Sequence, residues 1–255
     1  YGTGHSERLV AQVIKGRREQ VIVATKFGFE YDEARREIWG GRGDAAYVRW
    51  ACEQSLRRLG TDYLDLYQFH LGGYDGDALE TRQALEELVA EGKIRWYGWS
   101  TDDPTRARLF AAGEHCTAIQ QSLSVLGGNF ETLAVCEQHN LASINRGPLV
   151  KGLLTGKFDH DSTFPANDNR ARWDLKAGRE AEQLRQFRQV REVLTAGGRT
   201  PAQGALCWLW ARSDKTIPIP GFKTVAQVEE NARAMEFGPL SAAEMAQIEQ
   251  ILGRA

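Results

Sequence analysis

The sequence predicts an α/β protein in which parallel strands alternate with helices. Short apolar runs without polar alternation recur along the chain, as expected of strands that are covered on both faces. Segments of helical periodicity separate these runs, and no Pro-, Gly- or Ser-rich linker interrupts them. Repeated βαβ order implies parallel strands joined by right-handed crossovers. We therefore expect a single domain over residues 1–255, in which about six βα units are visible.

The strands are predicted from β-branched and aromatic runs. The first is Val-Ile-Val-Ala-Thr-Lys-Phe at residues 21–27, which ends just before a glycine. Its length and composition are typical of a buried strand of a parallel sheet. Runs of the same kind follow at residues 63–70, 94–100, 118–123, 141–145 and 216–220.

The helices are predicted from apolar residues spaced three and four positions apart. One begins near Asp44, and the next ends at Gly92, because a glycine suits the left-handed position that follows a helix. Another begins near His5, and the segment from Ser241 to Glu244 forms a capping box for the last helix. The remaining helices are expected at residues 104–112, 130–139, 178–196, 202–211, 225–235 and 241–252.

Two closures of the sheet are compatible with this order, an open doubly wound sheet and a barrel. The glycine fingerprint of a Rossmann domain is missing, because Gly2-x-Gly4 neither follows a strand nor precedes a third glycine. The segment that could bind a nucleotide, residues 219–231, lies near the C-terminus. Barrels commonly bind phosphate in this part of the chain, after strands 7 and 8. We therefore predict a (β/α)8 TIM barrel, and we expect the first two βα units to lie upstream of Tyr1.

Composition and charge exclude several classes of protein. There are 34 acidic and 32 basic residues, a balance unlike that of nucleic-acid or anionic-membrane binders. No apolar run could span a bilayer, and the first residues lack the pattern of a signal peptide. We expect a cytoplasmic protein with a small-molecule substrate and no metal, and the sequence leaves its oligomeric state open. The cysteines are too scattered for disulfides or zinc and are expected to be reduced and buried: Cys52, Cys116, Cys136 and Cys207.

Polar residues stand at the ends of three predicted strands. Lys26, His70 and Ser100 each follow apolar neighbours, and the carboxyl ends of parallel barrel strands open onto one mouth. Tyr1 precedes a helix and is expected on a loop at the same mouth. A lysine ammonium beside a phenol lowers the phenol's pKa from about 10, so that the phenol can protonate a carbonyl oxygen. The structural alternatives are that Lys26 forms a strand-end ion pair and His70 is a core histidine.

Seven segments resemble, in order, successive motifs of the aldo-keto reductases. The resemblance covers essentially the whole chain, and seven ordered motifs are far more specific than any one of them. It implies a (β/α)8 barrel that binds NADPH without a Rossmann domain and reduces carbonyl compounds. The segments are Tyr1–Glu7, Ala24–Gly28, Asp65–His70, Gly98–Thr101, Ile119–Ser124, Gly147–Lys157 and Ile219–Asn231.

The resemblance also assigns catalytic roles. Tyr1 matches the family's proton donor, Lys26 the lysine that lowers its pKa, and His70 the histidine that orients the carbonyl. The family's fourth catalytic residue, an aspartate, precedes the tyrosine and is expected upstream. Aromatic residues near the mouth are expected to make the substrate pocket apolar, namely Phe27, Phe29 and Trp99.

Further positions match the family's cofactor-binding residues. Ser100 and Gln120 match residues that bind the nicotinamide carboxamide, Thr101 replaces a more usual Asn, and Leu123 stands where many members stack a Tyr. Lys223 suits the 2′-phosphate of NADPH, and its alternative is an exposed surface lysine. The pyrophosphate positions are Gly147, Pro148, Leu149 and Gly152, and the adenosine positions are Gly221, Lys223, Thr224, Gln227, Glu230 and Asn231.

Three functions remain open from the sequence. The first is an NADPH-dependent reductase of aldehydes or ketones, which Tyr1, Lys26 and His70 together favour. The second is a regulatory subunit that binds NADPH with little turnover, and the third is an inactive truncated barrel. The sequence does not name the carbonyl substrate. Trp39 and Trp173 lie in polar stretches, where such a residue either forms part of a lid or pins a loop.

Overall fold

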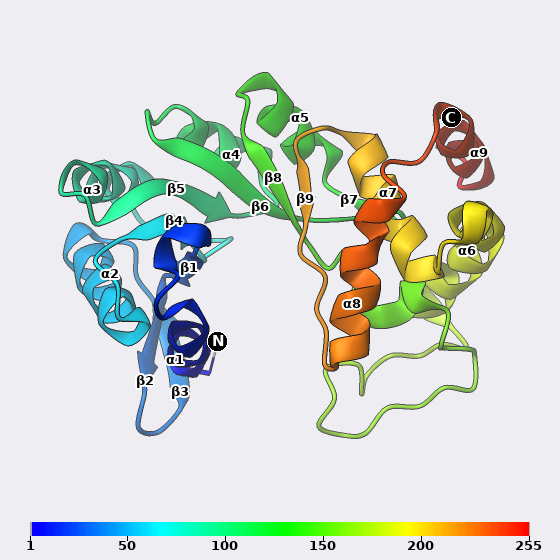
Figure 1. The fold of residues 1–255 in the computed structure, drawn as a ribbon, viewed down its shortest axis with the longest axis horizontal. Coiled ribbons are helices and arrows are strands. Elements are labelled where there is room, and N and C mark those ends of the chain that lie inside the picture. Colours follow the sequence, from blue (N-terminus) through cyan, green and yellow to red (C-terminus); the bar gives the residue numbers. More distant parts are fainter. Residues whose placement is uncertain (1, 255) are drawn as a thin grey trace. The chain divides into compact units, whose positions relative to one another are not determined.

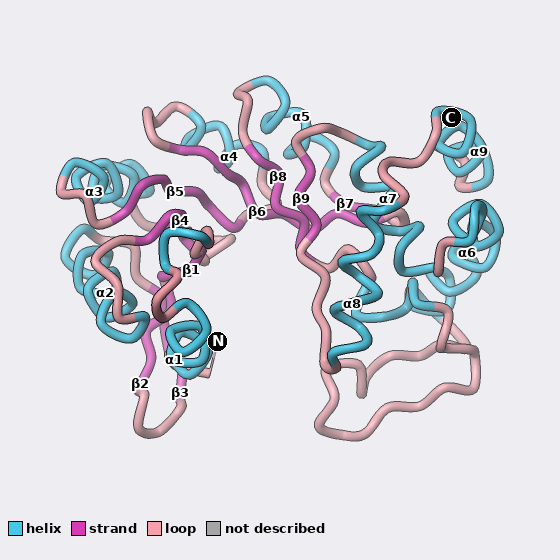
Figure 2. The backbone as a smooth tube through the Cα atoms, in the orientation of Figure 1, coloured by secondary structure: helices cyan, strands magenta, loops and turns pink. Residues whose placement is uncertain are grey.

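The computed structural model describes residues 2–254. The chain forms two compact units (Figure 1). Unit 1 comprises Tyr1–Gln120 and Phe130–Ala142, and unit 2 comprises Gln121–Asn129 and Ser143–Ala255. The predicted alternation of strands and helices runs through both units (Figure 2).

Unit 1 is built on parallel strands, β1 (Ala24–Phe27), β4 (Leu64–Phe69), β5 (Ile94–Ser100) and β6 (Cys116–Ser124), which pair in that order. The register places Lys26 opposite Gln68, and Ser100 opposite Gln120. An antiparallel hairpin, β2 (Phe29–Asp32) and β3 (Glu37–Gly41), follows β1. The helices are α1 (His5–Ile14), η1 (Arg18–Gln20), α2 (Ala45–Leu59), α3 (Ala78–Ala90), α4 (Pro104–Ala111) and α5 (Phe130–Gln138).

Unit 2 contains the end of β6, β7 (Gly127–Gly128), and the parallel pair β8 (Ala142–Arg146) and β9 (Thr216–Pro218). Its long helices are α6 (Gly178–Thr195), α7 (Pro201–Arg212), α8 (Val225–Arg233) and α9 (Ala242–Ile251). Short 3-10 turns occupy η2 (Val150–Thr155), η3 (Ala196–Gly198) and η4 (Ala234–Glu236). The long connection between η2 and α6 contains no regular element (Figure 1).

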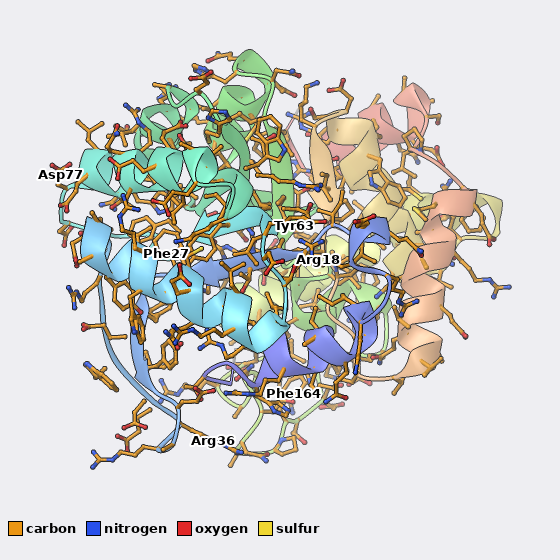
Figure 3. The ribbon with its side chains drawn as sticks, turned by 60° about the vertical axis from the view of Figure 1, so that its left-hand side comes forward. Arg18, Phe27, Arg36, Tyr63, Asp77 and Phe164 are labelled. Atoms are coloured by element: carbon orange, nitrogen blue, oxygen red, sulfur yellow. The ribbon has the colours of Figure 1, made fainter. Side chains whose placement is uncertain are left out.

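The core of unit 1 lies between its sheet and helices α2, α3 and α4. Phe69 sits among aromatic rings, with the centroids of Phe27 and Trp99 each 5.2 Å from its own. Asp65 fixes the amino ends of the strands, because its carboxylate pairs with Arg18 at 2.8 Å and accepts the Val23 N–H. Figure 3 shows Arg18 beside Tyr63, and the guanidinium lies 4.0 Å from the ring centroid.

The predicted elements are confirmed, with ends that shift by a few residues. The last helix begins with the predicted capping box, in which Ser241 and Glu244 bond each other's backbone. Gly92 adopts φ +74° after α3, as predicted. The four cysteines are buried free thiols. The β2–β3 hairpin was not predicted, because its charged residues hide the short alternation.

None of the described helices is both long and apolar enough to cross a membrane.

Candidate functional site

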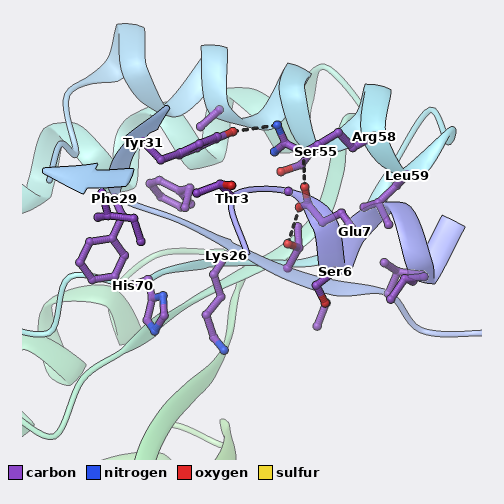
Figure 4. A pocket seen from close by; sticks show the side chains of 18 of the residues that line it. Thr3, Ser6, Glu7, Lys26, Phe29, Tyr31, Ser55, Arg58, Leu59 and His70 are labelled. Carbon is purple, nitrogen blue, oxygen red and sulfur yellow. Dashed lines mark hydrogen bonds and ion pairs between the residues drawn. The ribbon is translucent and has the colours of Figure 1, made fainter. Parts of the chain in front are cut away.

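Lys26 and His70 line one pocket of unit 1. The cavity measures about 250 Å³ and lies between β1, the β2–β3 hairpin, α1 and α2. Both side chains point to the same side of it (Figure 4). The backbone N–H of His70 donates to the Phe27 carbonyl at 2.8 Å, and this bond joins the end of β4 to β1. The Phe29 ring stands edge-on to the imidazole at 5.2 Å between centroids. The structure thus brings together two of the predicted catalytic residues.

The backbone that follows Tyr1 also reaches this pocket. Tyr1 itself lies outside the described residues. Thr3 and Gly4 line the cavity, and α1 begins directly after them. Gly2, Thr3 and Gly4 have φ values of +63°, +47° and +93°, so this turn uses left-handed backbone at three consecutive positions. Thr3 is buried, which holds the turn against unit 1.

A largely buried ion pair, which no sequence motif indicated, lines the same pocket. Glu7 of α1 accepts hydrogen bonds of 2.6 Å from Thr25 Oγ1 and from Arg58 Nε. Arg58 also donates to the Tyr31 hydroxyl at 2.7 Å. Burial raises the pKa of Tyr31, although the Arg58 charge opposes this. Arg58 and Glu7 are 51 positions apart, and no motif joins them.

Trp99 does not line this pocket, contrary to the prediction. Trp99 is 1% exposed and packs in the aromatic core, 4.5 Å from Phe110 between ring centroids. Its indole N–H donates to the Leu71 carbonyl. Phe27 and Phe29 do line the pocket.

The predicted nicotinamide-binding residues lie on neighbouring strands. Ser100 and Gln120 are register partners and are 6% and 3% exposed. Thr101 is almost fully buried, and its hydroxyl donates to the Gly72 carbonyl and accepts the Asp103 N–H. Leu123 is fully buried in β6. Sequence analysis missed Gln68, the register partner of Lys26, whose buried Oε1 has no hydrogen-bond partner among residues 2–254.

All the predicted pyrophosphate and adenosine positions except Thr224 line a second pocket, within unit 2. This cavity measures about 990 Å³. Backbone φ is positive at Gly147, Val150, Lys151 and Gly152, a run of left-handed residues around one turn. Within this turn the Val150 and Gly152 N–H groups donate to the Gly147 and Leu149 carbonyls, each at 2.9 Å. The predicted residues that line it are Gly147, Pro148, Leu149, Gly152, Gly221, Lys223, Gln227, Glu230 and Asn231.

Lys223 and Thr224 are placed by the start of α8. The Lys223 N–H donates to Gln227 Oε1 at 2.7 Å, and Thr224 caps the helix by accepting the Gln227 N–H. Lys223 is exposed, as the alternative from the sequence also allows. Its position on the pocket wall nevertheless leaves the ammonium available to an anion.

A segment that sequence analysis did not nominate completes this pocket. Asp168 and Arg170 form a two-bonded pair, and Arg170 also donates to the Lys151 carbonyl at 3.1 Å. The Arg170 guanidinium holds the pKa of Asp168 well below its usual value, and Lys223 adds to the effect. Trp173 packs edge-on against Phe164 at 5.7 Å, so this tryptophan pins the segment.

The His115 side chain belongs to a hydrogen-bonded cluster outside both pockets. His115 Nδ1 lies 2.6 Å from a Glu86 oxygen, and Glu86 also accepts from the Tyr97 hydroxyl. Trp39 is 64% exposed on β3. Among residues 2–254, no group of three or more His, Cys, Asp or Glu side chains is arranged to hold a metal ion.

Comparison with known proteins gives one consistent result. Residues 1–253 match the Aldo/keto reductase family. Aldo-keto reductase yakc [NADP(+)] of Schizosaccharomyces pombe is 32% identical over 248 residues, which cover 92% of this chain and 72% of that protein. An oxidoreductase of Bacillus subtilis, YqkF, is also 32% identical over 92% of this chain and 74% of its own length.

Solved structures agree. The glycerol dehydrogenase AKR11B4 from Gluconobacter oxydans is 28% identical with a TM-score of 0.87, and covers 98% of this chain and 78% of its own. A Klebsiella pneumoniae aldo/keto reductase in complex with NADP and acetate is 31% identical with a TM-score of 0.72, over 99% of this chain and 77% of its own. These likenesses confirm the predicted (β/α)8 fold class. The chain therefore belongs to the aldo/keto reductase family, and it is an oxidoreductase.

Proposed function

We propose that this chain reduces aldehydes or ketones to alcohols with NADPH. The observation that carries the proposal is the shared pocket of Lys26 and His70, which also includes the backbone that follows Tyr1. Two cationic or hydrogen-bond-donating side chains in one partly apolar cavity suit a carbonyl oxygen, whose negative charge grows as hydride arrives. The family relatives that bind NADP support the cofactor.

Each catalytic residue then has a separate task. Tyr1 gives the proton to the substrate oxygen, and the Lys26 ammonium stabilises the phenolate that remains. His70 donates a hydrogen bond to the same oxygen and so orients the carbonyl. The edge-on Phe29 ring limits how the imidazole can turn, because the two rings are in contact. Phe27 and Phe29 supply the apolar wall that favours a hydrocarbon group on the substrate.

The residues of unit 2 fit the phosphate groups of NADPH. The left-handed turn from Gly147 to Gly152 lines the cavity, and its glycines lack the side chains that would fill the space for a phosphate. Lys223 supplies a cation for the 2′-phosphate. Ser100 and Gln120 of unit 1 would hydrogen-bond the nicotinamide carboxamide. When bound, NADPH supplies the hydride.

The proposal extends to the context of the enzyme. We propose that residues 1–255 act as one reductase domain and that the protein works in the cytoplasm. Its four free thiols support a reducing compartment.

The test is NADPH oxidation with a panel of aromatic and aliphatic aldehydes and ketones. Turnover should fall at least about a hundredfold in Tyr1→Phe, because a phenyl ring has no proton to give, while the Kd of NADPH stays unchanged. Tyr63→Phe is the matched control, because Tyr63 lies between Arg18 and Arg95 and does not line the pocket. NADPH binding without turnover of any carbonyl would instead support a regulatory subunit.

A further inference from the structure

We propose that Glu7 and Arg58 are positioning residues of the proton-donating site. Their largely buried ion pair connects α1, which follows Tyr1 in the sequence, with β1, which carries Lys26, and with β2, which carries the aromatic neighbour of His70. It holds these segments in one geometry. The inference rests on the function proposed above, and it adds residues that the motifs do not assign to catalysis.

Besides the bond between its two members, the ion pair contacts three other parts of unit 1. Glu7 of α1 binds Thr25 of β1 through one oxygen and Arg58 of α2 through the other, both at 2.6 Å. Arg58 binds the hydroxyl of Tyr31 on β2 at 2.7 Å. Figure 4 shows this chain of bonds along the wall of the pocket. The backbone of Gly4 lies against the Arg58 side chain, because a Cβ there would be 2.6 Å from Arg58 Cδ.

These contacts act on the residues next to the chemistry. Thr25 directly precedes Lys26, and adjacent strand residues point to opposite faces. The hydrogen bond between Thr25 and Glu7 therefore fixes the position and orientation of β1. It thereby fixes the direction of the Lys26 side chain. Helix α1 begins at His5, shortly after Tyr1 in the sequence, and Glu7 anchors this helix to β1 and α2.

Stability alone is a poor reason for such a pair. The side chains of Glu7 and Arg58 are only 13% and 10% exposed. Removing two charges from water carries a large desolvation cost, and apolar residues of similar volume often stabilise a buried site equally well or better. What an ion pair adds is direction, because each oxygen and each N–H must meet its partner in a set geometry.

The first experiment measures kcat and KM separately in Thr25 and Glu7 variants. Thr25→Val is nearly isosteric and removes only the hydroxyl that Glu7 holds. We expect its kcat to fall by about tenfold, because small misplacements of reacting groups are costly, while the KM for NADPH stays within about twofold. Thr25→Ser keeps the hydroxyl and should restore kcat. Glu7→Gln should lower kcat more than Thr25→Val, because it also leaves the Arg58 charge unpaired.

A matched control is available on the same helix. Arg49 of α2 pairs with Glu87 and Glu91 of α3, and its side chain is 38% exposed. Arg49→Gln removes an interhelical ion pair that is remote from the pocket lining, and it should leave kcat unchanged. If Thr25→Val and Glu7→Gln behave like Arg49→Gln in kcat, the positioning role is wrong.

A second readout does not depend on turnover. Amide hydrogen exchange should accelerate at residues 5–10, 24–27 and 29–32 in Glu7→Gln, because these segments share the ion pair. Arg49→Gln should leave those segments protected. Unchanged exchange in Glu7→Gln overturns the inference even if the enzyme is active. Faster exchange in a chain that reduces no carbonyl leaves the coupling intact and rejects the proposed function instead.

Discussion

The two pockets differ in how their polar groups are held. In unit 1, Lys26 and His70 come from the ends of strands, and a buried ion pair supports the wall beside them. In unit 2, the polar groups come from turns and from the start of α8, and Lys223 is exposed. The first cavity measures about 250 Å³ and the second about 990 Å³.

This difference matches two kinds of task. Proton transfer needs atoms placed to a fraction of an ångström, which strands and buried partners provide. Binding a long, charged cofactor needs many weaker contacts over a large surface, and loops supply these through backbone N–H groups. The predictions below test whether the two pockets have separate roles.

The largest effect is expected for Lys26→Met. The loss of the ammonium should lower kcat by about a hundred- to ten-thousandfold, because the phenol of Tyr1 then gives up its proton with less assistance. The Kd of NADPH should change less than about threefold. Steady-state kinetics and cofactor fluorescence titration measure the two quantities. Lys176→Met, on an exposed lysine of unit 2, is the control. If Lys26→Met lost cofactor affinity together with kcat, catalysis and cofactor binding would not be separate roles of the two pockets.

A moderate effect on stability is expected where glycines let backbones approach closely. A Cβ at Gly98 would lie 2.2 Å from the Ala118 carbonyl oxygen in unit 1, and one at Gly204 would lie 2.1 Å from that of Leu194 in unit 2. Each alanine variant should lose about 1–3 kcal/mol of unfolding free energy through overpacking. If residues 1–255 are one cooperative domain, both variants lower the same calorimetric transition. Two transitions that respond separately would contradict the single-domain proposal.

Lys223→Ala should weaken NADPH binding by about tenfold, the low end of a charge-assisted hydrogen bond, because the lysine is exposed. The affinity for NADH should barely change, since NADH lacks the 2′-phosphate. Isothermal titration with both cofactors at two salt concentrations measures this. An equal loss for NADH would show that Lys223 does not recognise the 2′-phosphate.

The smallest effect is expected from acid titration of two carboxylates. Burial raises the pKa of Glu86, but bonds from Tyr97 and His115 outweigh it and hold the pKa below 4.5. Arg170 holds the pKa of Asp168 well below 3.8. Each carboxylate therefore stabilises the fold at pH values above its ordinary pKa. This contribution disappears as the pH falls through the folded-state pKa.

Unfolding measured against pH separates these two carboxylates. The stability difference between the parent and Glu86→Gln should be below about 1 kcal/mol near neutral pH and vanish first on acidification. The difference for Asp168→Asn should persist to lower pH, because the pKa of Asp168 is depressed further. If the Asp168 difference vanished at a higher pH than the Glu86 difference, the Asp168–Arg170 pair of unit 2 would be the weaker interaction.

Much of the fold was predictable because local patterns specify it. Apolar runs such as residues 21–27 and the capping box at Ser241 depend on neighbours within a few positions, and the structure contains the predicted elements. Lys26 and His70 were also predictable as neighbours, since strand ends of a parallel sheet lie together. The role of Tyr1, the substrate and the cofactor preference stay predictions.

The sequence by itself determined the order of strands and helices, their caps and the polar residues at strand ends, because these follow from periodicity and short-range hydrogen bonding. Only the tertiary structure decided which distant side chains meet. Glu7 and Arg58 are far apart in the chain and form an ion pair, and Trp99 packs against Phe110 of helix α4 and not in the pocket. Such contacts depend on how whole elements pack, and no local pattern encodes the distance between two elements.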